Sequence, residues 1–346
     1  MSLTPQELYR TYLASEEKNF NKRFADDECP RAQYGDFKLL RTIRATARVK
    51  VFRAQHLITR EECTLRVLRK IYFNETEQKN TLSREKKIQY AARSPFIDKL
   101  LYAFQDNSSV YFVSEYPLYG TLERIFDLYD KVPENLSKLI AAQIILGLEY
   151  LQACKIIYRN LKPANILLFH DGYLKLTNFK LASKLTGWVP SAFGTIPYMA
   201  PEQFATDSID HNVDWWSFGV ILYDLLLGDI PFAPDKGKRS TDLIRKIKRA
   251  DIKLDANQKK IIHPDAEDLI RNLLKKDFAR RLGALGDGAA AVKGHAWFRE
   301  IDFLSLYEKR ILMKWDLKPQ NFDTFVSADN SLASARDSHG GHFSDF

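Results

Sequence analysis

Glycine, cysteine and long apolar runs are all scarce in this chain of 346 residues. Glycine is missing between Gly35 and Gly120, so no loop in that stretch can use its permissive backbone. The three cysteines are widely spaced and show no metal-type pairing, which predicts reduced thiols in a cytosolic compartment. The longest apolar run, residues 140–151, is shorter than the roughly 20 residues that a bilayer span needs. These absences argue against a disulfide scaffold, a cysteine metal site and a transmembrane helix.

Charge and the first residues indicate an intracellular protein. The net charge is +8, but Lys and Arg are spread along the chain, which is typical of a solvated basic surface. The first residues have neither a basic-then-apolar signal pattern nor a Met-Gly start. We expect a cytoplasmic protein, with the nucleus as a second location. It should have no membrane anchor, bind no nucleic acid and be monomeric when free.

The hydrophobic pattern divides the chain into four stretches. They are an amphipathic helix with a linker at 1–36, short β-rich runs with one charged helical stretch (75–92) at 37–116, mostly helical sequence at 117–298, and a polar tail at 299–346. The pattern predicts an α+β protein in which a small sheet-rich unit precedes a larger helical one.

Four segments in fixed order resemble the signature segments of a protein kinase. They are YRNLKPAN at 158–165, NFK at 178–180, APE at 200–202 and DWWSFG at 214–219. They correspond to the catalytic loop, the metal-binding triplet, the end of the activation segment and a central helix. Because the similarity runs from Phe37 to about Phe303, the chain resembles AGC-type Ser/Thr kinases, most closely the cyclic-AMP-dependent protein kinase catalytic subunits. This implies a two-lobed fold with ATP between the lobes, and an N-terminal helix and C-terminal tail that wrap both.

The residues that carry phosphoryl transfer in this family are replaced in the large lobe. The carboxylate that accepts the substrate hydroxyl proton corresponds to Asn160, which has no anionic form. The carboxylate that joins Mg²⁺ to the phosphates corresponds to Asn178, a neutral ligand for a cation that prefers charged oxygen. Asn165, the second metal ligand, and Lys162, a phosphate-side lysine, are kept. The resemblance therefore retains one metal ligand and one lysine but neither carboxylate.

The small lobe differs from the family as well. The glycine-rich loop falls on residues 44–49, which contain no glycine, so the backbone clamp on phosphates is lost or replaced by side-chain cations. The strand lysine falls on Arg66, which keeps the charge and can pair with the helix glutamate expected at Glu85. Its wider guanidinium would still shift the phosphates. Lys180 and Lys50 stay open as alternative sources of the missing amine.

The resemblance also implies which residues would surround a nucleotide. Val51, Thr64, Glu115 and Leu167 correspond to positions of the ATP site, and Phe325 stands where the tail of the family places a tyrosine beside the adenine. ATP and Mg²⁺ are the cofactors that the family implies. The replacements predict that neither is used productively.

The retained residues are structural ones. Glu202 and Arg281 stand where the family has a buried ion pair that anchors the activation segment, and Asp214 where it braces the catalytic loop. The hydrophobic stack that joins the lobes falls on Tyr158, Phe179, Leu100 and the polar Gln89. These residues argue for the fold and not for turnover.

Substrate selection and regulation are altered too. The acidic positions that select basic peptides correspond to Thr121, Ala164 and Asp224, of which only Asp224 is anionic. Two phosphosites of the family fall on Ser191 and Ser334, and both stay open between modified and plain serines. The terminal Phe343 and Phe346 indicate a chain end that docks on the small lobe.

Loop, strand lysine, base and metal ligand are thus all changed. We predict a pseudokinase that acts as a signalling scaffold or modulator and binds protein partners, with a cyclic-AMP-binding regulatory subunit as the first candidate. The alternative left open is a weak or unconventional Ser/Thr kinase that holds ATP through Lys180 or Arg48. Asn178 discriminates between them, because a phosphotransferase must recruit metal there.

Overall fold

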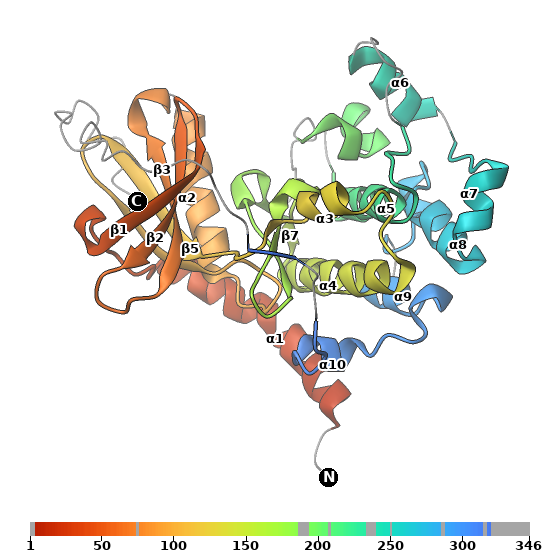
Figure 1. The fold of residues 1–346 in the computed structure, drawn as a ribbon, viewed down its shortest axis with the longest axis horizontal. Helices are drawn as coiled ribbons and strands as arrows, with labels where there is room; N and C mark the ends of the chain where they lie inside the picture. Colours follow the sequence, from red (N-terminus) through yellow and green to blue (C-terminus); the bar gives the residue numbers. More distant parts are fainter. Residues whose placement is uncertain are drawn as a thin grey trace.

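Two lobes make up the computed structural model of this chain (Figure 1). The described residues are 4–73, 76–185, 194–206, 209–232, 240–249, 251–284, 288–313 and 317–319. A small lobe of strands with one long helix lies beside a larger, mostly helical lobe. The expectation of an α+β fold is confirmed.

The small lobe is built on a five-stranded antiparallel sheet in the order β1-β2-β3-β5-β4. Its strands are β1 (Phe37–Ala45), β2 (Val49–His56), β3 (Glu62–Arg69), β4 (Leu100–Gln105) and β5 (Ser109–Glu115). Successive side chains point to opposite faces, so Leu65 and Val67 of β3 are buried together on the outer face. The β-rich runs expected from the sequence are these strands.

Helix α2 (Thr76–Ala91) covers the other face of this sheet, which we call the inner face. Leu82 of α2 packs with Leu68 and Phe112 from the strands. Further along the helix, Ile88 belongs to the core of the large lobe. The charged helical stretch expected at 75–92 is therefore a helix that touches both lobes.

Apolar helices form the centre of the large lobe. Its helices are α3 (Glu123–Leu128), α4 (Glu134–Ala153), α5 (Asn212–Leu227), α6 (Ser240–Arg249), α7 (Ala256–Ile261), α8 (Pro264–Leu273), α9 (Ala289–Lys293) and α10 (Phe303–Tyr307). Almost every residue of α5 is buried, including Trp215, Trp216 and Phe218. A helix that is apolar all round is expected to lie inside a core.

Short strands position the segments that resemble kinase motifs. One group is β6 (Gly120–Thr121), β8 (Ile166–Leu168) and β9 (Leu174–Leu176), and the other pairs β7 (Ile156–Ile157) with β10 (Ser183–Lys184). The hairpin between β8 and β9 turns at Gly172, whose φ of 78° favours glycine. Residues 158–165 lie between β7 and β8, and 178–180 follow β9, so the hairpin brings the two motifs together.

Short 3-10 turns complete the described chain. They are η1 (Tyr34–Asp36), η2 (Lys70–Tyr72), η3 (Pro163–Asn165), η4 (Phe179–Leu181), η5 (Ile196–Tyr198), η6 (Pro201–Phe204), η7 (Phe278–Arg280) and η8 (Ala296–Phe298). Turns η3 and η4 end the two motifs just described.

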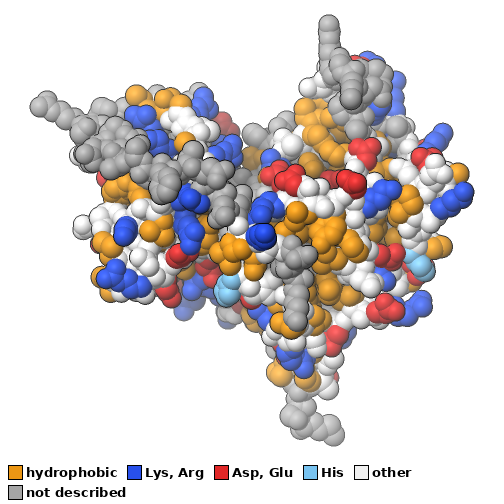
Figure 2. Space-filling model, viewed as in Figure 1, with side chains coloured by type: hydrophobic (Ala, Val, Ile, Leu, Met, Phe, Trp, Pro, Cys, Tyr) orange, Lys and Arg blue, Asp and Glu red, His pale blue; other side chains and the backbone are white. Residues whose placement is uncertain are grey.

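Charged side chains cover both lobes. Figure 2 shows Lys and Arg spread over the visible surface, and a group of acidic side chains over α3 of the large lobe. This agrees with the dispersed basic charge of the sequence. None of the described helices is long and apolar enough to cross a membrane.

Helix α1 (Pro5–Asp26) lies along both lobes and runs from α10 to α2 (Figure 1). Thr4 begins it with a capping box: its hydroxyl accepts a hydrogen bond from the Glu7 amide, and the Glu7 carboxylate accepts one from the Thr4 amide. Phe20 is completely buried in the core of the large lobe. The helix expected at the N-terminus is confirmed.

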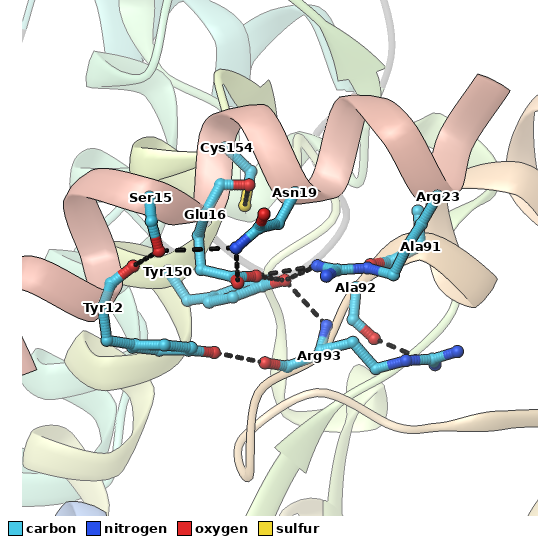
Figure 3. A network of polar contacts seen from close by, with 10 residues as sticks. All are labelled: Tyr12, Ser15, Glu16, Asn19, Arg23, Ala91, Ala92, Arg93, Tyr150 and Cys154. Atoms are coloured by element: carbon cyan, nitrogen blue, oxygen red, sulfur yellow. Dashed lines mark hydrogen bonds and ion pairs between the residues drawn. The ribbon is translucent and has the colours of Figure 1, made fainter. Parts of the chain in front are cut away.

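A polar network fixes α1 to the two lobes at once (Figure 3). Glu16 is 3% exposed, and its Oε2 accepts hydrogen bonds from Arg23 Nη2 at 2.7 Å and from the Tyr150 hydroxyl of α4 at 2.9 Å. Arg23 Nε donates to the carbonyl of Ala91 at the end of α2, at 2.7 Å. The network therefore joins α2 of the small lobe and α4 of the large lobe through one helix.

Candidate functional site

A row of side chains crosses the inner face of the small-lobe sheet. Arg44 of β1 is the cross-strand partner of Val51, and Val51 is the partner of Arg66. Directly opposed residues point to the same face, so the three side chains are neighbours. Arg66 pairs with Glu85 of α2 at 2.9 Å between Nη2 and Oε1, and its guanidinium lies 4.3 Å from the centre of the Phe112 ring. The strand cation and the helix glutamate thus lie in contact.

The turn between β1 and β2 is held by its own hydrogen bonds. The Thr46 amide donates to the Val49 carbonyl at 2.9 Å, and the Val49 amide donates to the Thr46 hydroxyl at 3.0 Å. These amides already have partners inside the turn, and the side chains from Arg44 to Arg48 are exposed. Two amides of the turn are therefore already occupied, and a phosphate there would also meet the exposed side chains of Arg44 and Arg48.

The end of strand β5 contacts β9 of the large lobe. The Thr64 hydroxyl donates to the Glu115 carbonyl at 3.3 Å, and the Glu115 carboxylate pairs with Lys175. Lys175 is the cross-strand partner of Leu167, and its ammonium lies 4.5 Å from the centre of the Phe169 ring. Of the expected nucleotide-side residues, Glu115 and Leu167 are therefore partners of Lys175, which the sequence did not single out, and Thr64 contacts Glu115.

Three asparagines form a closed ring of hydrogen bonds at the expected base and metal positions. Asn160 Nδ2 donates to the Asn178 carbonyl at 2.9 Å, and Asn165 Nδ2 donates to the Asn160 carbonyl at 2.7 Å. Asn178 Nδ2 closes the ring by donating to Asn165 Oδ1 at 3.1 Å. Asn178 has a left-handed backbone with φ of 62°, which asparagine tolerates better than most residues. We call this arrangement the asparagine ring.

The orientation of each amide in the asparagine ring follows from its neighbours. A backbone carbonyl only accepts hydrogen bonds, so Asn160 and Asn165 must direct their NH₂ groups at the carbonyls that they contact. Asn165 then presents its oxygen to Asn178, which must answer with an N–H. The side chain at the metal-bridging position therefore directs an N–H at Asn165 and keeps one uncharged oxygen where the family has a carboxylate.

The asparagine ring does not fit a divalent metal. Mg²⁺ held between residues 165 and 178 needs oxygen from both, preferably charged, and here one of the two presents N–H to the other. Among the described residues, no group of three or more His, Cys, Asp or Glu side chains could hold a metal. The Mg²⁺ that the family implies would meet uncharged amide groups in this ring in place of both carboxylates.

Lys162 contacts the segment that follows the activation loop. Its ammonium donates to the Thr195 hydroxyl at 3.0 Å. Both residues line a small cavity together with Tyr198, Met199 and Ser217. Lys162 is thus held against Thr195 and lines the same small cavity as Asn160 of the asparagine ring.

Two buried carboxylates brace the site. Asp214 accepts hydrogen bonds from the Tyr158 and Arg159 amides at 2.9 and 2.7 Å. Burial raises the pKa of Asp214 to about 6, although these hydrogen bonds oppose the shift. Glu202 and Arg281 form a buried ion pair with N–O distances of 2.5 and 2.9 Å. Both contacts occur where the sequence expected them.

A buried polar cluster of Gln89, Asp98 and Thr177 lies between the lobes. Asp98 Oδ2 accepts hydrogen bonds from Thr177 Oγ1 at 2.8 Å and Gln89 Nε2 at 3.2 Å, and Asp98 is 1% exposed. The Tyr158 hydroxyl donates to the Thr177 carbonyl. The sequence pointed to Gln89 but missed Asp98, whose signal is a lone acidic residue in the otherwise apolar run PFID at 95–98.

Acidic residues near α3 modify the expected substrate surface. Burial and then the neighbouring Asp229 raise the pKa of Asp224 to about 6. Thr121 lies on β6, and its hydroxyl is 3.5 Å from a Glu123 carboxylate oxygen. Glu123 was missed because an exposed acid at the start of a helix is ordinary. Other predicted positions lie outside the described residues: Ser191, Phe325, Ser334, Phe343 and Phe346.

The family model for the protein kinase domain matches residues 41–298. The chain therefore belongs to the protein kinase family, as its two lobes and braced loop indicate. Among its relatives, cAMP-dependent protein kinase type 3 of Saccharomyces cerevisiae is 34% identical over 278 residues, which cover 80% of this chain and 68% of the yeast protein. The resemblance to cyclic-AMP-dependent and other AGC kinases is confirmed.

Two further relatives widen the comparison. The cAMP-dependent protein kinase catalytic subunit 3 of Drosophila melanogaster is 30% identical over 318 residues, which cover 90% of this chain and 53% of that protein. Human ribosomal protein S6 kinase alpha-1 is 33% identical over 305 residues, which cover 85% of this chain and 40% of that protein. The chain thus spans about half or less of the length of these two.

Proposed function

We propose that this chain is a catalytically silent kinase that acts in signalling by binding a protein partner. The asparagine ring carries the proposal, because it puts amides at both positions where phosphoryl transfer needs carboxylates. Phosphoryl transfer depends on positioning and charge neutralisation by metal ions. A cleft that lacks these carboxylates lacks the main contribution to catalysis.

Each replacement is expected to remove a large factor in rate. An amide at Asn160 cannot accept the substrate proton, and loss of a general base removes roughly 10²–10⁴ in rate. The amide at Asn178 removes metal neutralisation of the phosphates in addition. Effects of residues that act together do not simply add, but both lower the rate.

The second candidate is a weak or unconventional Ser/Thr kinase. The contact between Arg66 and Glu85 favours it, because a cation is still held at the strand-lysine position. Lys180 and Arg48, which the sequence offered as alternative ATP-holding residues, are both exposed. A working enzyme of this kind would still have to recruit metal at Asn178.

A phosphotransfer assay separates the two candidates. The purified chain is incubated with labelled ATP, Mg²⁺ or Mn²⁺ and basic acceptor peptides, beside the double variant Asn160→Asp/Asn178→Asp. We expect no transfer by the wild type and measurable transfer by the double variant. Asn257→Asp, an exposed asparagine on α7, is the matched control and should stay silent. Wild-type transfer that disappears in Asn165→Ala would overturn the proposal.

The partner is part of the same proposal. The kinase shape is supported by the buried Glu202–Arg281 pair and by the Asp214 brace, neither of which requires turnover. The regulatory subunit that binds cyclic AMP is the first partner to test, by size-exclusion chromatography of the mixture. A complex that cyclic AMP dissociates would support this partner, whereas separate elution of the two proteins would exclude it.

A further inference from the structure

A buried polar contact holds α2 against the large lobe at Gln89. Gln89 Nε2 donates to the carbonyl of Asp98 and to its Oδ2, both at 3.2 Å, and Thr177 Oγ1 donates to the same Oδ2 at 2.8 Å. Gln89 is 4% exposed and Asp98 is 1% exposed. The other members of the stack that joins the lobes are apolar or aromatic. At Gln89, hydrogen bonds therefore replace apolar packing between the lobes.

Asp98 itself is fixed to the large lobe. Its amide donates to the carbonyl of Leu176 in β9 at 2.9 Å, and the Leu176 amide donates to the carbonyl of Phe96 at 2.8 Å. Ile97 pairs with Leu176 in a parallel bridge. Asp98 therefore moves with β9, and a movement of α2 away from β9 would stretch the hydrogen bonds from Gln89.

The carboxyl group of Asp98 is shielded from water. Its Oδ1 is buried and has no hydrogen-bond partner in the part of the chain that the structure describes, whereas Oδ2 accepts from both donors. An ionised carboxylate at this place would hold its charge away from water with one oxygen unsatisfied, which costs free energy. The closed contact between α2 and β9 therefore favours the neutral form of Asp98.

Neighbouring side chains act on the same proton. Burial raises the pKa of Asp98 to about 7, and the hydrogen bond from Thr177 opposes the rise. Glu115 raises this pKa further, whereas Lys175 and Ser114 lower it. Because Glu115 and Lys175 are paired with each other, their effects on Asp98 are opposed, and burial decides the direction.

Tyr158 and Glu85 are two more ionisable groups near this carboxyl group. Burial, followed by Asp214, Asp98 and Glu85, raises the pKa of the Tyr158 hydroxyl well above 10, so this hydroxyl stays neutral at neutral pH. The carboxylate of Glu85 is paired with Arg66 at 2.9 Å. Neither side chain therefore masks the titration of Asp98.

We propose that the proton on Asp98 is a switch on the position of α2. Neutral Asp98 keeps α2 closed on β9, and ionised Asp98 favours an open arrangement in which water reaches the carboxylate. Gln89 and Glu85 are four residues apart and lie on the same face of α2, so opening at Gln89 also strains the pair of Glu85 with Arg66. This switch goes beyond the proposed function and operates whether or not the chain transfers phosphate.

Hydrogen–deuterium exchange of the purified full chain tests the switch. Exchange of the α2 amides is followed by mass spectrometry between pH 5 and 8, and each rate is divided by the intrinsic chemical rate at that pH. Because the open form releases one proton, the opening constant should rise up to about tenfold per pH unit between pH 5 and 7. It should level off above about pH 7, and the protection of α2 should fall by the same factors.

Helix α5 separates this local opening from unfolding of the whole chain. Almost every residue of α5 is buried, so its amides exchange mainly when the large lobe unfolds. We expect α2 to be less protected than α5 at pH 7. Equal protection of the two helices at every pH would overturn the proposal, because α2 would then open only together with the rest of the chain.

The variant Asp98→Asn tests whether this carboxyl group holds the proton. Asparagine cannot ionise, so the protection of α2 should not change between pH 5 and 8. Asp127→Asn, an exposed change of the same kind on α3, is the matched control and should follow the wild type. The same pH dependence in Asp98→Asn and in the wild type would refute the switch.

A second variant keeps Asp98 in place and makes the test independent of how the first one folds. Thr177→Val removes a hydroxyl that lowers the pKa of Asp98 and keeps the side-chain size. The pH at which the protection of α2 levels off should therefore move upward. An unmoved profile would contradict a switch that depends on the proton of Asp98.

Discussion

Replacing Asp98 with asparagine should remove a pH dependence from the stability of the fold. Burial raises the pKa of Asp98 from its ordinary 3.8 to about 7, against the hydrogen bond from Thr177; Glu115 also raises it and Lys175 lowers it. The folded state thus holds this proton more tightly than the unfolded chain does. The stabilisation that comes from this bound proton is fully present below about pH 4, and it is lost as the pH rises to about 7.

The size of the effect follows from the same difference. The rise in the pKa of Asp98 from 3.8 to about 7 corresponds to on the order of 4 kcal/mol in the free energy of unfolding. This is an upper limit, because it assumes that the unfolded chain titrates normally. Asparagine at 98 can still accept hydrogen bonds from Gln89 and Thr177 through its oxygen. Because asparagine does not titrate, the free energy of unfolding of the variant should lack this dependence on pH.

Urea unfolding of both proteins between pH 5 and 8 measures the difference. Asp214 and Asp224 also have a raised pKa of about 6, so the comparison uses the gap between variant and wild type at each pH. We expect the gap to move in favour of Asp98→Asn by about 2–3 kcal/mol between pH 5 and 8, the part of the effect that lies between pH 5 and the pKa of about 7. Asp127→Asn, an exposed change on α3, should run parallel to the wild type. Parallel curves for Asp98→Asn would refute the reasoning.

Two further changes test how the fold is held. Glu202→Gln leaves the guanidinium of Arg281 buried with a neutral partner and should cost about 3–5 kcal/mol in thermal unfolding. Replacing both residues with apolar ones of similar volume should recover part of that loss, and equal losses would contradict a charge effect. Glu16→Ala removes the acceptor shared by α1 and α4 and should cost about 1–3 kcal/mol. Limited proteolysis should then cut α1 first, whereas an unchanged pattern would show that apolar packing alone holds the helix.

The fold could be predicted from the sequence because four motifs occur at fixed spacing. The amides at Asn160 and Asn178 are visible in the sequence as well, but their ring is not. It depends on backbone carbonyls that come together only when the β8–β9 hairpin places both loops side by side. Lys175 was missed because a lysine between two leucines in a short strand reads as solvent-facing. In the fold, the Lys175 side chain instead meets Glu115 at the end of β5.

Helix α1 connects the two lobes mechanically, because it is bonded to one helix of each. Arg23 donates a hydrogen bond to the end of α2, the helix that carries Glu85. Glu16 accepts one from Tyr150 of α4 in the other lobe. A rigid rotation of α2 would therefore either break the contact between Arg23 and Ala91 or move α1 together with α2. A protein that bound α1 and shifted it would therefore also move α2, and with it Glu85, without contacting Arg66 or the asparagine ring.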